Sequence, residues 1–138
     1  MQLDQTGAAL ANARVLQARE CLESSERDLA ANSFKAAANR SYYCIFHSMR
    51  AILAFEEFDS KKHSGVISAF RQRYIKTEVF PVLFSDIVAK AFKVRNDSDY
   101  QDFYVISKDD VAAQIENAKT FLTAVEEYVN AKCREVNT

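Results

Sequence analysis

The sequence predicts an all-α fold, a bundle of five helices, on three observations. Apolar residues make up 49% of the 138 residues, enough for a buried core in one domain. The chain has only two glycines and one proline, too few for the many turns of an all-β sandwich or barrel. Apolar residues also recur at spacings of three and four in five separate segments. We therefore expect a single domain over residues 1–138, with its core at about 8–132.

The first two predicted helices are long and form an antiparallel pair. The helix expected at 8–30 has an apolar stripe made of Val15, Ala18, Leu22 and Leu29. The helix expected at 33–55 is apolar over a wider face, which is typical of a central helix. This face includes Ala38, Tyr42, Ile45, Met49 and Ile52. The turn between the two helices is short, so they run antiparallel as neighbours, and Asn32 is expected to cap the second one.

Three further helices complete the predicted bundle. The third follows the polar segment 56–64 and carries Val66, Ile67, Phe70 and Tyr74. Pro81 suits the first turn of the fourth helix, where its missing N–H costs nothing. The apolar line of the fourth helix is formed by Phe84, Val88 and Ala91. The sequence SKDD at 107–110 has the pattern of a capping box and opens the fifth helix.

Composition excludes several classes of protein. No apolar run approaches the ~18 residues of a membrane span, and residues 1–14 lack the features of a signal peptide. Three cysteines without regular spacing do not indicate a disulfide framework. Cys44 and His47 are three residues apart, but two ligands are half a metal site, and a buried cysteine beside a packed histidine is the simpler interpretation. We expect a cytoplasmic protein that does not cross a membrane and needs no metal or cofactor.

Positive charge is concentrated in the middle of the chain. Residues 61–95 carry eight basic and two acidic side chains, whereas the whole chain has a net charge of −1. The basic members are Lys61, Lys62, Arg71, Arg73, Lys76, Lys90, Lys93 and Arg95. Such a block favours phosphate binding. The alternative is a solvated pair of helices that complements acidic helices elsewhere in the domain.

The end of the fourth helix is unusually polar, with the sequence RNDSDY at 95–100. Arg95 and Asp99 lie one helical turn apart, and so do Asn96 and Tyr100. Arg95 also continues the apolar line of this helix, so we expect it at the rim of the core. An arginine fork held by an acid, next to an amide and a phenol, suits a phosphate. The alternative is an exposed Arg–Asp pair beside a tyrosine that packs on the bundle.

Four segments carry a resemblance to a known family. They are AANRSYYCIFHSMRAILAFE at 37–56, KKHSGVISAFRQRYIK at 61–76, RNDSDY at 95–100 and SKDDVAAQIENAKTFLTAVEEYV at 107–129. Together with the order of the helices, these segments resemble a HEPN domain, and most closely the small stand-alone prokaryotic HEPN proteins. The resemblance extends from about Leu16 to Val129.

The resemblance implies a helical bundle that dimerises. Many HEPN proteins are metal-independent ribonucleases, and many are encoded beside a minimal nucleotidyltransferase as a toxin–antitoxin pair. The usual motif is an arginine, then four to six residues, then a histidine. Arg95 and the polar Asn96 match its opening, but no histidine follows: Tyr100 and Asp102 stand at the two ends of the permitted spacing. A phenol, with a reference pKa of ~10, is a poor base at neutral pH.

Two functions remain open from the sequence. In the first, the chain cleaves RNA: Arg95 stabilises the anionic phosphorane, Asn96 positions the phosphate, and Asp99 or Tyr100 orients Arg95 or handles a proton. RNA or nucleotide contacts are expected from Lys61, Lys62, His63, Arg71, Arg73 and Lys93. In the second, the chain is an inactive module that binds a nucleotide or a partner. The expected partners are a second copy of the chain, a minimal nucleotidyltransferase, and RNA or a nucleotide.

Overall fold

The computed structural model describes residues 2–136, and within this range it contains five α-helices and no strand. The helices are α1 (Gln2–Ala30), α2 (Phe34–Leu53), α3 (His63–Phe70), α4 (Val82–Tyr100) and α5 (Lys108–Val136). A 3-10 turn, η1 (Ala54–Glu56), follows α2, and a π-helical turn, η2 (Arg71–Ile75), follows α3. The prediction of an all-α bundle of five helices is confirmed. None of the described helices is long and apolar enough to cross a membrane.

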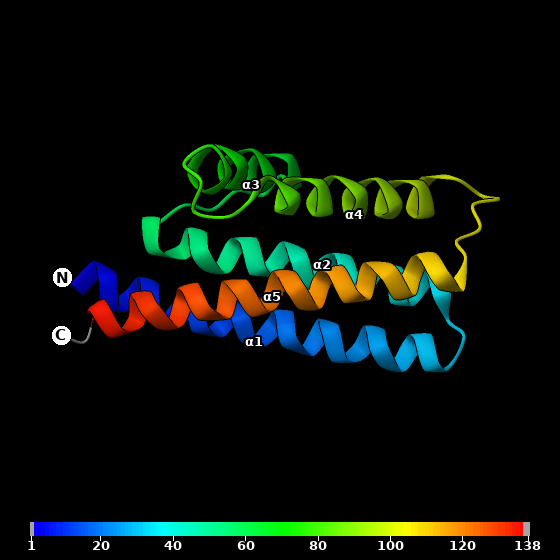
Figure 1. Cartoon of the computed structure of the whole chain (residues 1–138), viewed down its shortest axis with the longest axis horizontal. Helices are drawn as coiled ribbons and strands as arrows, with labels where there is room; N and C mark the ends of the chain where they lie inside the picture. Colours follow the sequence, from blue (N-terminus) through cyan, green and yellow to red (C-terminus); the bar gives the residue numbers. More distant parts are fainter. Residues whose placement is uncertain (1, 137–138) are drawn as a thin grey trace.

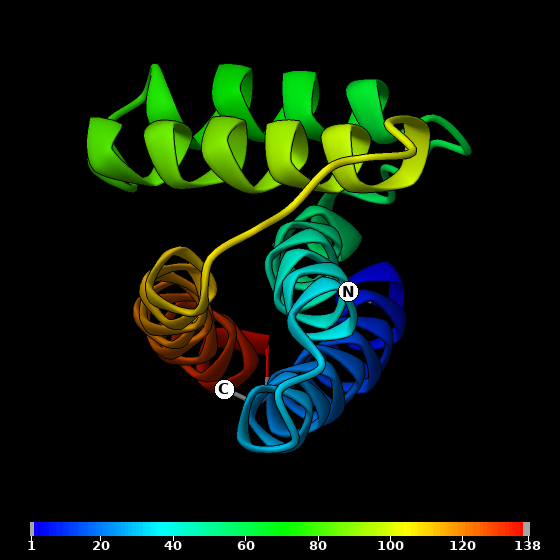
Figure 2. The same cartoon turned by 90° about the vertical axis from the view of Figure 1, so that its right-hand side faces the viewer.

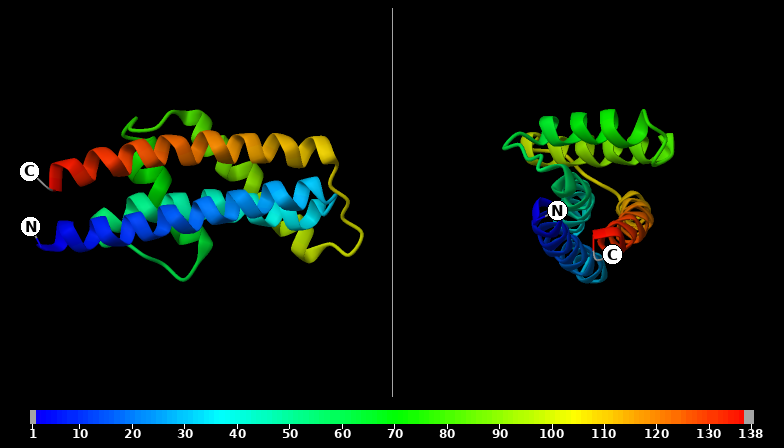
Figure 3. Two further views of the ribbon diagram at one scale, coloured as in Figure 1. Left: turned by 90° about the horizontal axis from the view of Figure 1, so that it is seen from below. Right: turned by 90° about the vertical axis from the view of Figure 1, so that its left-hand side faces the viewer.

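The helices form two layers. α1, α2 and α5 run along the length of the molecule, with α1 and α2 antiparallel as predicted (Figure 1). In the view along these three helices, α3 and α4 lie across them (Figure 2). The start of α1 and the end of α5 share one end of the molecule, and the α4–α5 connection is at the other (Figure 3). The last turn of α4 and this connection are therefore a projecting end of the fold.

The core is centred on α2, because this helix contacts α1 and α5 in its own layer and α3 and α4 in the other. Its fully buried side chains include Tyr42, Ile45, Met49, Ile52 and Leu53. A second group of buried aromatic rings joins the crossing layer to α5. It comprises Phe70, Tyr74, Phe80, Phe84 and Phe121. The Tyr74 hydroxyl donates a hydrogen bond to the Glu56 carboxylate, which ties η2 to η1.

Helix ends differ from the predictions in three places, the first being α1, which begins at Gln2 and not at about residue 8. Asn32 does not cap α2: Ser33 occupies that position, and Asn32 has φ 61°, in the left-handed region. Asparagine tolerates this region, and here it ends α1, because the Ser33 N–H bonds the Asp28 carbonyl at 2.8 Å. Pro81 precedes α4 instead of lying in its first turn. The predicted cap at Ser107 is present, since its Oγ accepts the Asp110 N–H at 3.1 Å.

Candidate functional site

Arg95 lies in the last two turns of α4, at the rim of the core. Its side chain is 20% exposed, and Nε is 3.2 Å from Oδ2 of Asp99, the partner expected from the spacing. The Nε–H does not point at that carboxylate, so Nε is buried without a hydrogen bond within the described part of the chain. Asp99 therefore holds Arg95 as an ion pair and leaves the Nε–H without a hydrogen bond.

His63, the first residue of α3, lies beside Arg95 although the two are 32 residues apart in sequence. His63 Nδ1 is 2.6 Å from the Tyr42 hydroxyl and 3.5 Å from Nη1 of Arg95. Arginine can only donate, so Nδ1 is assigned as the acceptor and the ring proton as bound to Nε2. Nε2 has no hydrogen-bond partner among residues 2–136. The ring stacks on Phe46 at 4.1 Å, which fixes its orientation.

Two tyrosines of α2 also contact the Arg95 guanidinium. The Arg95 Cζ lies 5.6 Å from the Tyr42 ring centre and 5.9 Å from that of Tyr43. Arg95 Nη2 also donates to the Tyr43 hydroxyl at 3.5 Å. Burial raises the pKa of Tyr42, so this phenol stays protonated and donates to His63. Aromatic faces attract a guanidinium, so the charge of Arg95 is held between α2 and α3.

The second histidine of the chain lies in the same region. The His47 ring is 5.9 Å from that of Tyr43 and 5.8 Å from that of Phe46, the ring on which His63 stacks. Its Nδ1 is 3.4 Å from Nη1 of Arg50. Tyr42, Tyr43, His47, His63, Arg95 and Asp99 are called the Arg95 site below.

Guanidinium groups at and around the Arg95 site outnumber the carboxylates with which they pair. Arg14 and Arg50 share Asp59, at 3.2 and 3.3 Å, and the side chain of Arg14 is only 7% exposed. The Arg40 guanidinium lies over the Tyr43 ring at 5.2 Å. With Arg95 there are four guanidinium groups against the carboxylates of Asp59 and Asp99. The resulting positive potential suits a bound phosphate.

This field and burial keep both imidazoles neutral. Burial, followed by the charges of Arg50, Arg14, Arg40 and His63, lowers the pKa of His47 to about 4. Burial, followed by the charges of Arg95 and Arg50, lowers the pKa of His63. A phosphate bound among these cations adds negative charge, which raises both pKa values toward neutrality.

The neutral form of His47 links protein stability to pH. The folded state disfavours the imidazolium, so between pH 4 and 6.5 the unfolded chain binds more protons. The stabilisation is complete above pH 6.5 and is lost as pH falls toward 4. Between pH 7 and pH 5, the free energy of unfolding should fall by about 1–2 kcal/mol more in the wild type than in His47→Gln. Urea titrations of both proteins at each pH measure this; parallel pH profiles would contradict it.

The structure brings together only part of the residues expected at the helix end. Arg95, Asp99 and His63 are in contact. Tyr100 is 78% exposed, and within the described residues neither it nor Asn96 makes a hydrogen bond or ion pair. The two lie one turn apart on α4, as the spacing requires, but on a more open part of its surface.

The basic block is divided among several places. Lys93 pairs with Asp97 at 2.7 Å, and Arg73 pairs with Glu56 at 3.3 Å. Arg71 instead donates to the hydroxyl of Ser85 on α4. The remaining two contacts expected from the sequence are exposed on the segment before α3, and they are Lys61 and Lys62. The block is thus no single continuous cationic surface.

Sequence reasoning missed the contribution of α2. Tyr42 and Tyr43 had been assigned to the core, and His47 to helix packing. The signal was a polar stripe on an otherwise apolar helix, at spacings of three and four, formed by Arg40, Tyr43, His47 and Arg50. No group of three or more potential metal ligands occurs among the residues that the structure describes.

Comparisons with known proteins agree with this architecture. A family model described as HEPN domain matches residues 11–128. The chain is 29% identical over 116 residues to "Putative toxin MJ0142" of Methanocaldococcus jannaschii, covering 84% of this chain and 79% of that protein. It is 30% identical over 113 residues to a "UPF0332 protein" of Thermotoga maritima, covering 82% and 86%. A shorter match, 33% over 67 residues and about half of each chain, is to "Putative toxin MJ0605" of M. jannaschii.

Proposed function

The chain belongs to the HEPN domain family, and on this premise we propose that it is a metal-independent ribonuclease whose active site is the Arg95 site. The observation that carries the proposal is the contact between Arg95 and His63. A phosphate-binding cation and an imidazole are the two groups that RNA cleavage needs most. Here they come from different helices, so the function does not depend on a histidine that follows Arg95 in sequence.

The proposed reaction is attack of a ribose 2′-OH on the adjacent phosphate. A bond forms between O2′ and phosphorus, the bond from phosphorus to O5′ breaks, and the products are a 2′,3′-cyclic phosphate and a 5′-OH. Arg95 stabilises the charge on the phosphorane, with its guanidinium held by Tyr42, Tyr43 and Asp99. In-line attack places O2′ and O5′ on opposite sides of phosphorus, so two groups are needed for the two proton transfers. His63 and His47 share them: in the RNA complex one is neutral and accepts the 2′-OH proton, while the other, protonated beside the bound phosphate, donates its proton to O5′.

The test is cleavage of single-stranded RNA by the purified protein in the presence of EDTA. We expect fragments that end in a 2′,3′-cyclic phosphate and begin with a 5′-OH. An RNA with a 2′-O-methyl group at every ribose is the matched control, because its nucleophile is blocked and it should stay intact. Cleavage that needs a divalent metal, or that leaves a 5′-phosphate, would contradict the mechanism.

A second candidate is an inactive HEPN module that binds a nucleotide or a partner. It is favoured by the missing histidine after Arg95 and by the exposure of Tyr100. In that case the protein binds RNA or a nucleotide, Arg95→Ala abolishes the binding, and no product forms.

We also propose that the chain is the toxin-like component of a two-protein module, with a minimal nucleotidyltransferase as its partner. The support is the names of two relatives, each called a putative toxin. Co-expression with a nucleotidyltransferase encoded next to the gene tests this: a complex that survives purification and suppresses cleavage is expected.

The same chain should form a homodimer through the projecting end of α4. Three large apolar or aromatic side chains are exposed there, Tyr100 at 78%, Phe103 at 97% and Val105 at 87%. Pairing of two copies would cover them and bring two Arg95 sites to one groove. Sedimentation at tens of micromolar protein, a concentration suited to weak interfaces, should give twice the 15.7 kDa of one chain. Phe103→Asp should weaken the dimer at least about tenfold, whereas Leu16→Asp on α1 should not; a monomeric wild type would refute the proposal.

A further inference from the structure

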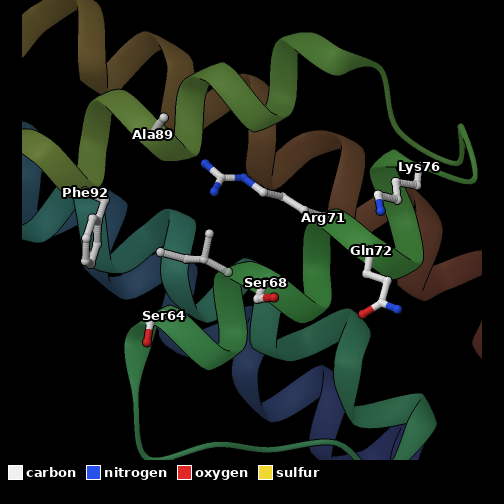
Figure 4. A pocket seen from close by; sticks show the side chains of 8 residues that line it. Ser64, Ser68, Arg71, Gln72, Lys76, Ala89 and Phe92 are labelled. Atoms are coloured by element: carbon white, nitrogen blue, oxygen red, sulfur yellow. The ribbon is translucent and has the colours of Figure 1, made fainter.

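A cavity of about 570 Å³ lies between the α3–η2 segment and α4. Its lining is mixed: Ile67, Ala89 and Phe92 supply apolar surface, and Ser64, Ser68, Arg71, Gln72 and Lys76 supply polar and basic groups. None of the described residues that line it is acidic. In Figure 4 the Arg71 side chain extends from the α3–η2 segment across the cavity toward α4. The size is within the ~300–1,000 Å³ of small-ligand sites.

Arg71 is held ready for a ligand. Its Nε donates to Oγ of Ser85 at 3.0 Å, which fixes the guanidinium while its two terminal nitrogens stay unbonded among residues 2–136. Arg71 and Lys76 form no ion pair with a carboxylate within the described residues. Two other cations of the basic block differ, because Arg73 on η2 and Lys93 on α4 are each paired with an acid. Two unpaired cations at one cavity favour an anionic ligand.

The cavity continues toward the Arg95 site. Ser64 follows His63 in α3, and the ring of Phe92 is 6.2 Å from that of Tyr42. Ser85, which accepts the hydrogen bond from Arg71, begins a stripe along one face of α4. The stripe continues at spacings of four, three and four residues through Ala89, Phe92 and Asn96. Arg95 follows Phe92 by three residues and therefore lies within one helical turn of the cavity lining. From Ser85 to Arg95 the distance along the axis is about 15 Å, or ~4 nucleotides at the stacked spacing of one strand.

We propose that this cavity and its continuation along α4, together called the groove, bind the nucleotides next to the cleaved bond. One phosphate lies on Arg71 and Lys76, and one base lies against Phe92. A basic groove with an aromatic platform is how proteins hold a single strand without reading its sequence. The inference rests on the proposed ribonuclease function for its ligand, and adds a second phosphate subsite at a defined distance from the first.

The experiment measures binding without cleavage. A fluorescein-labelled, 2′-O-methylated single-stranded RNA of about eight nucleotides, roughly twice that span, is titrated with protein at several salt concentrations. Arg71→Ala should weaken binding about 10- to 100-fold, as expected for loss of a charge-assisted contact. It should also lower the slope of log K against log salt by about 0.7, the value for one phosphate contact on a single strand. Arg19→Ala is the matched control: it removes the same charge from α1, where Arg19 is paired with Glu126, and should leave the slope unchanged.

Lys76→Ala removes an exposed side chain and serves as a second variant if Arg71→Ala is poorly folded. It should weaken binding about 3- to 10-fold and lower the slope likewise. Equal affinities and slopes for the Arg71, Lys76 and Arg19 variants would overturn the subsite, even if the wild type cleaves RNA. Binding of AMP that depends on Arg71, without binding of the RNA, would overturn the strand assignment. Arg71-dependent RNA binding by a protein that never cleaves RNA would support the groove and refute the ribonuclease proposal.

Discussion

Arg95→Ala should lower the rate of RNA cleavage by ~10²- to 10³-fold, the usual cost of losing one preorganised donor to a developing anion. Arg95 is the guanidinium that Tyr42, Tyr43 and Asp99 hold in place beside His63. Its contribution is made to the phosphorane, so the loss should appear in kcat more than in KM. The measurement is a time course on labelled RNA in EDTA with each purified variant.

Lys93→Ala is the matched control for this prediction. Lys93 belongs to the same helix and is paired with Asp97, but it is 76% exposed and its ion pair is outside the Arg95 site. It should leave kcat within about twofold, since exposed pairs contribute little. Arg95→Ala should stay folded, because it removes a rim side chain and leaves Asp99 partly exposed to water. Equal cleavage by the wild type and Arg95→Ala would place the activity elsewhere or in a contaminant.

His63→Gln should lower the rate by ~10²- to 10⁴-fold, the range attributed to general acid–base catalysis. Glutamine is close in size and can still accept from Tyr42, but it cannot exchange a proton near pH 7. The loss should therefore be one of chemistry and leave RNA binding intact. The pH profile adds a signature that a structural role would not give: the limb that belongs to the imidazole should disappear in His63→Gln.

Tyr100→Phe is the control that compares the two candidate positions. Tyr100 stands where the family motif can have its histidine, yet it is largely exposed and has no polar partner within residues 2–136. The phenylalanine variant should retain nearly full activity. If Tyr100→Phe is impaired and His63→Gln is not, the site follows the linear motif and the assignment to His63 is wrong.

The helices could be predicted because their signals are local. Each of these signals depends on residues within about one helical turn of each other. They are the apolar stripes of α1 and α5, the cap at Ser107, and the ion pair of Arg95 with Asp99. The errors are local as well. Asn32 and Ser33 are both good N-caps, and only the backbone shows that Asn32 takes the left-handed conformation that ends α1.

The sequence by itself determined an all-α bundle and the family, and it singled out Arg95 as a candidate site residue. It could not determine that His63 meets Arg95, because the two residues are 32 positions apart and their contact depends on how α3 and α4 lie together across α2. The same holds for Tyr43, 52 residues before its partner Arg95. Spacing along one helix decides which side chains share a face, but the packing of helices decides which faces meet. The tertiary structure therefore places an imidazole beside Arg95, from the first residue of another helix.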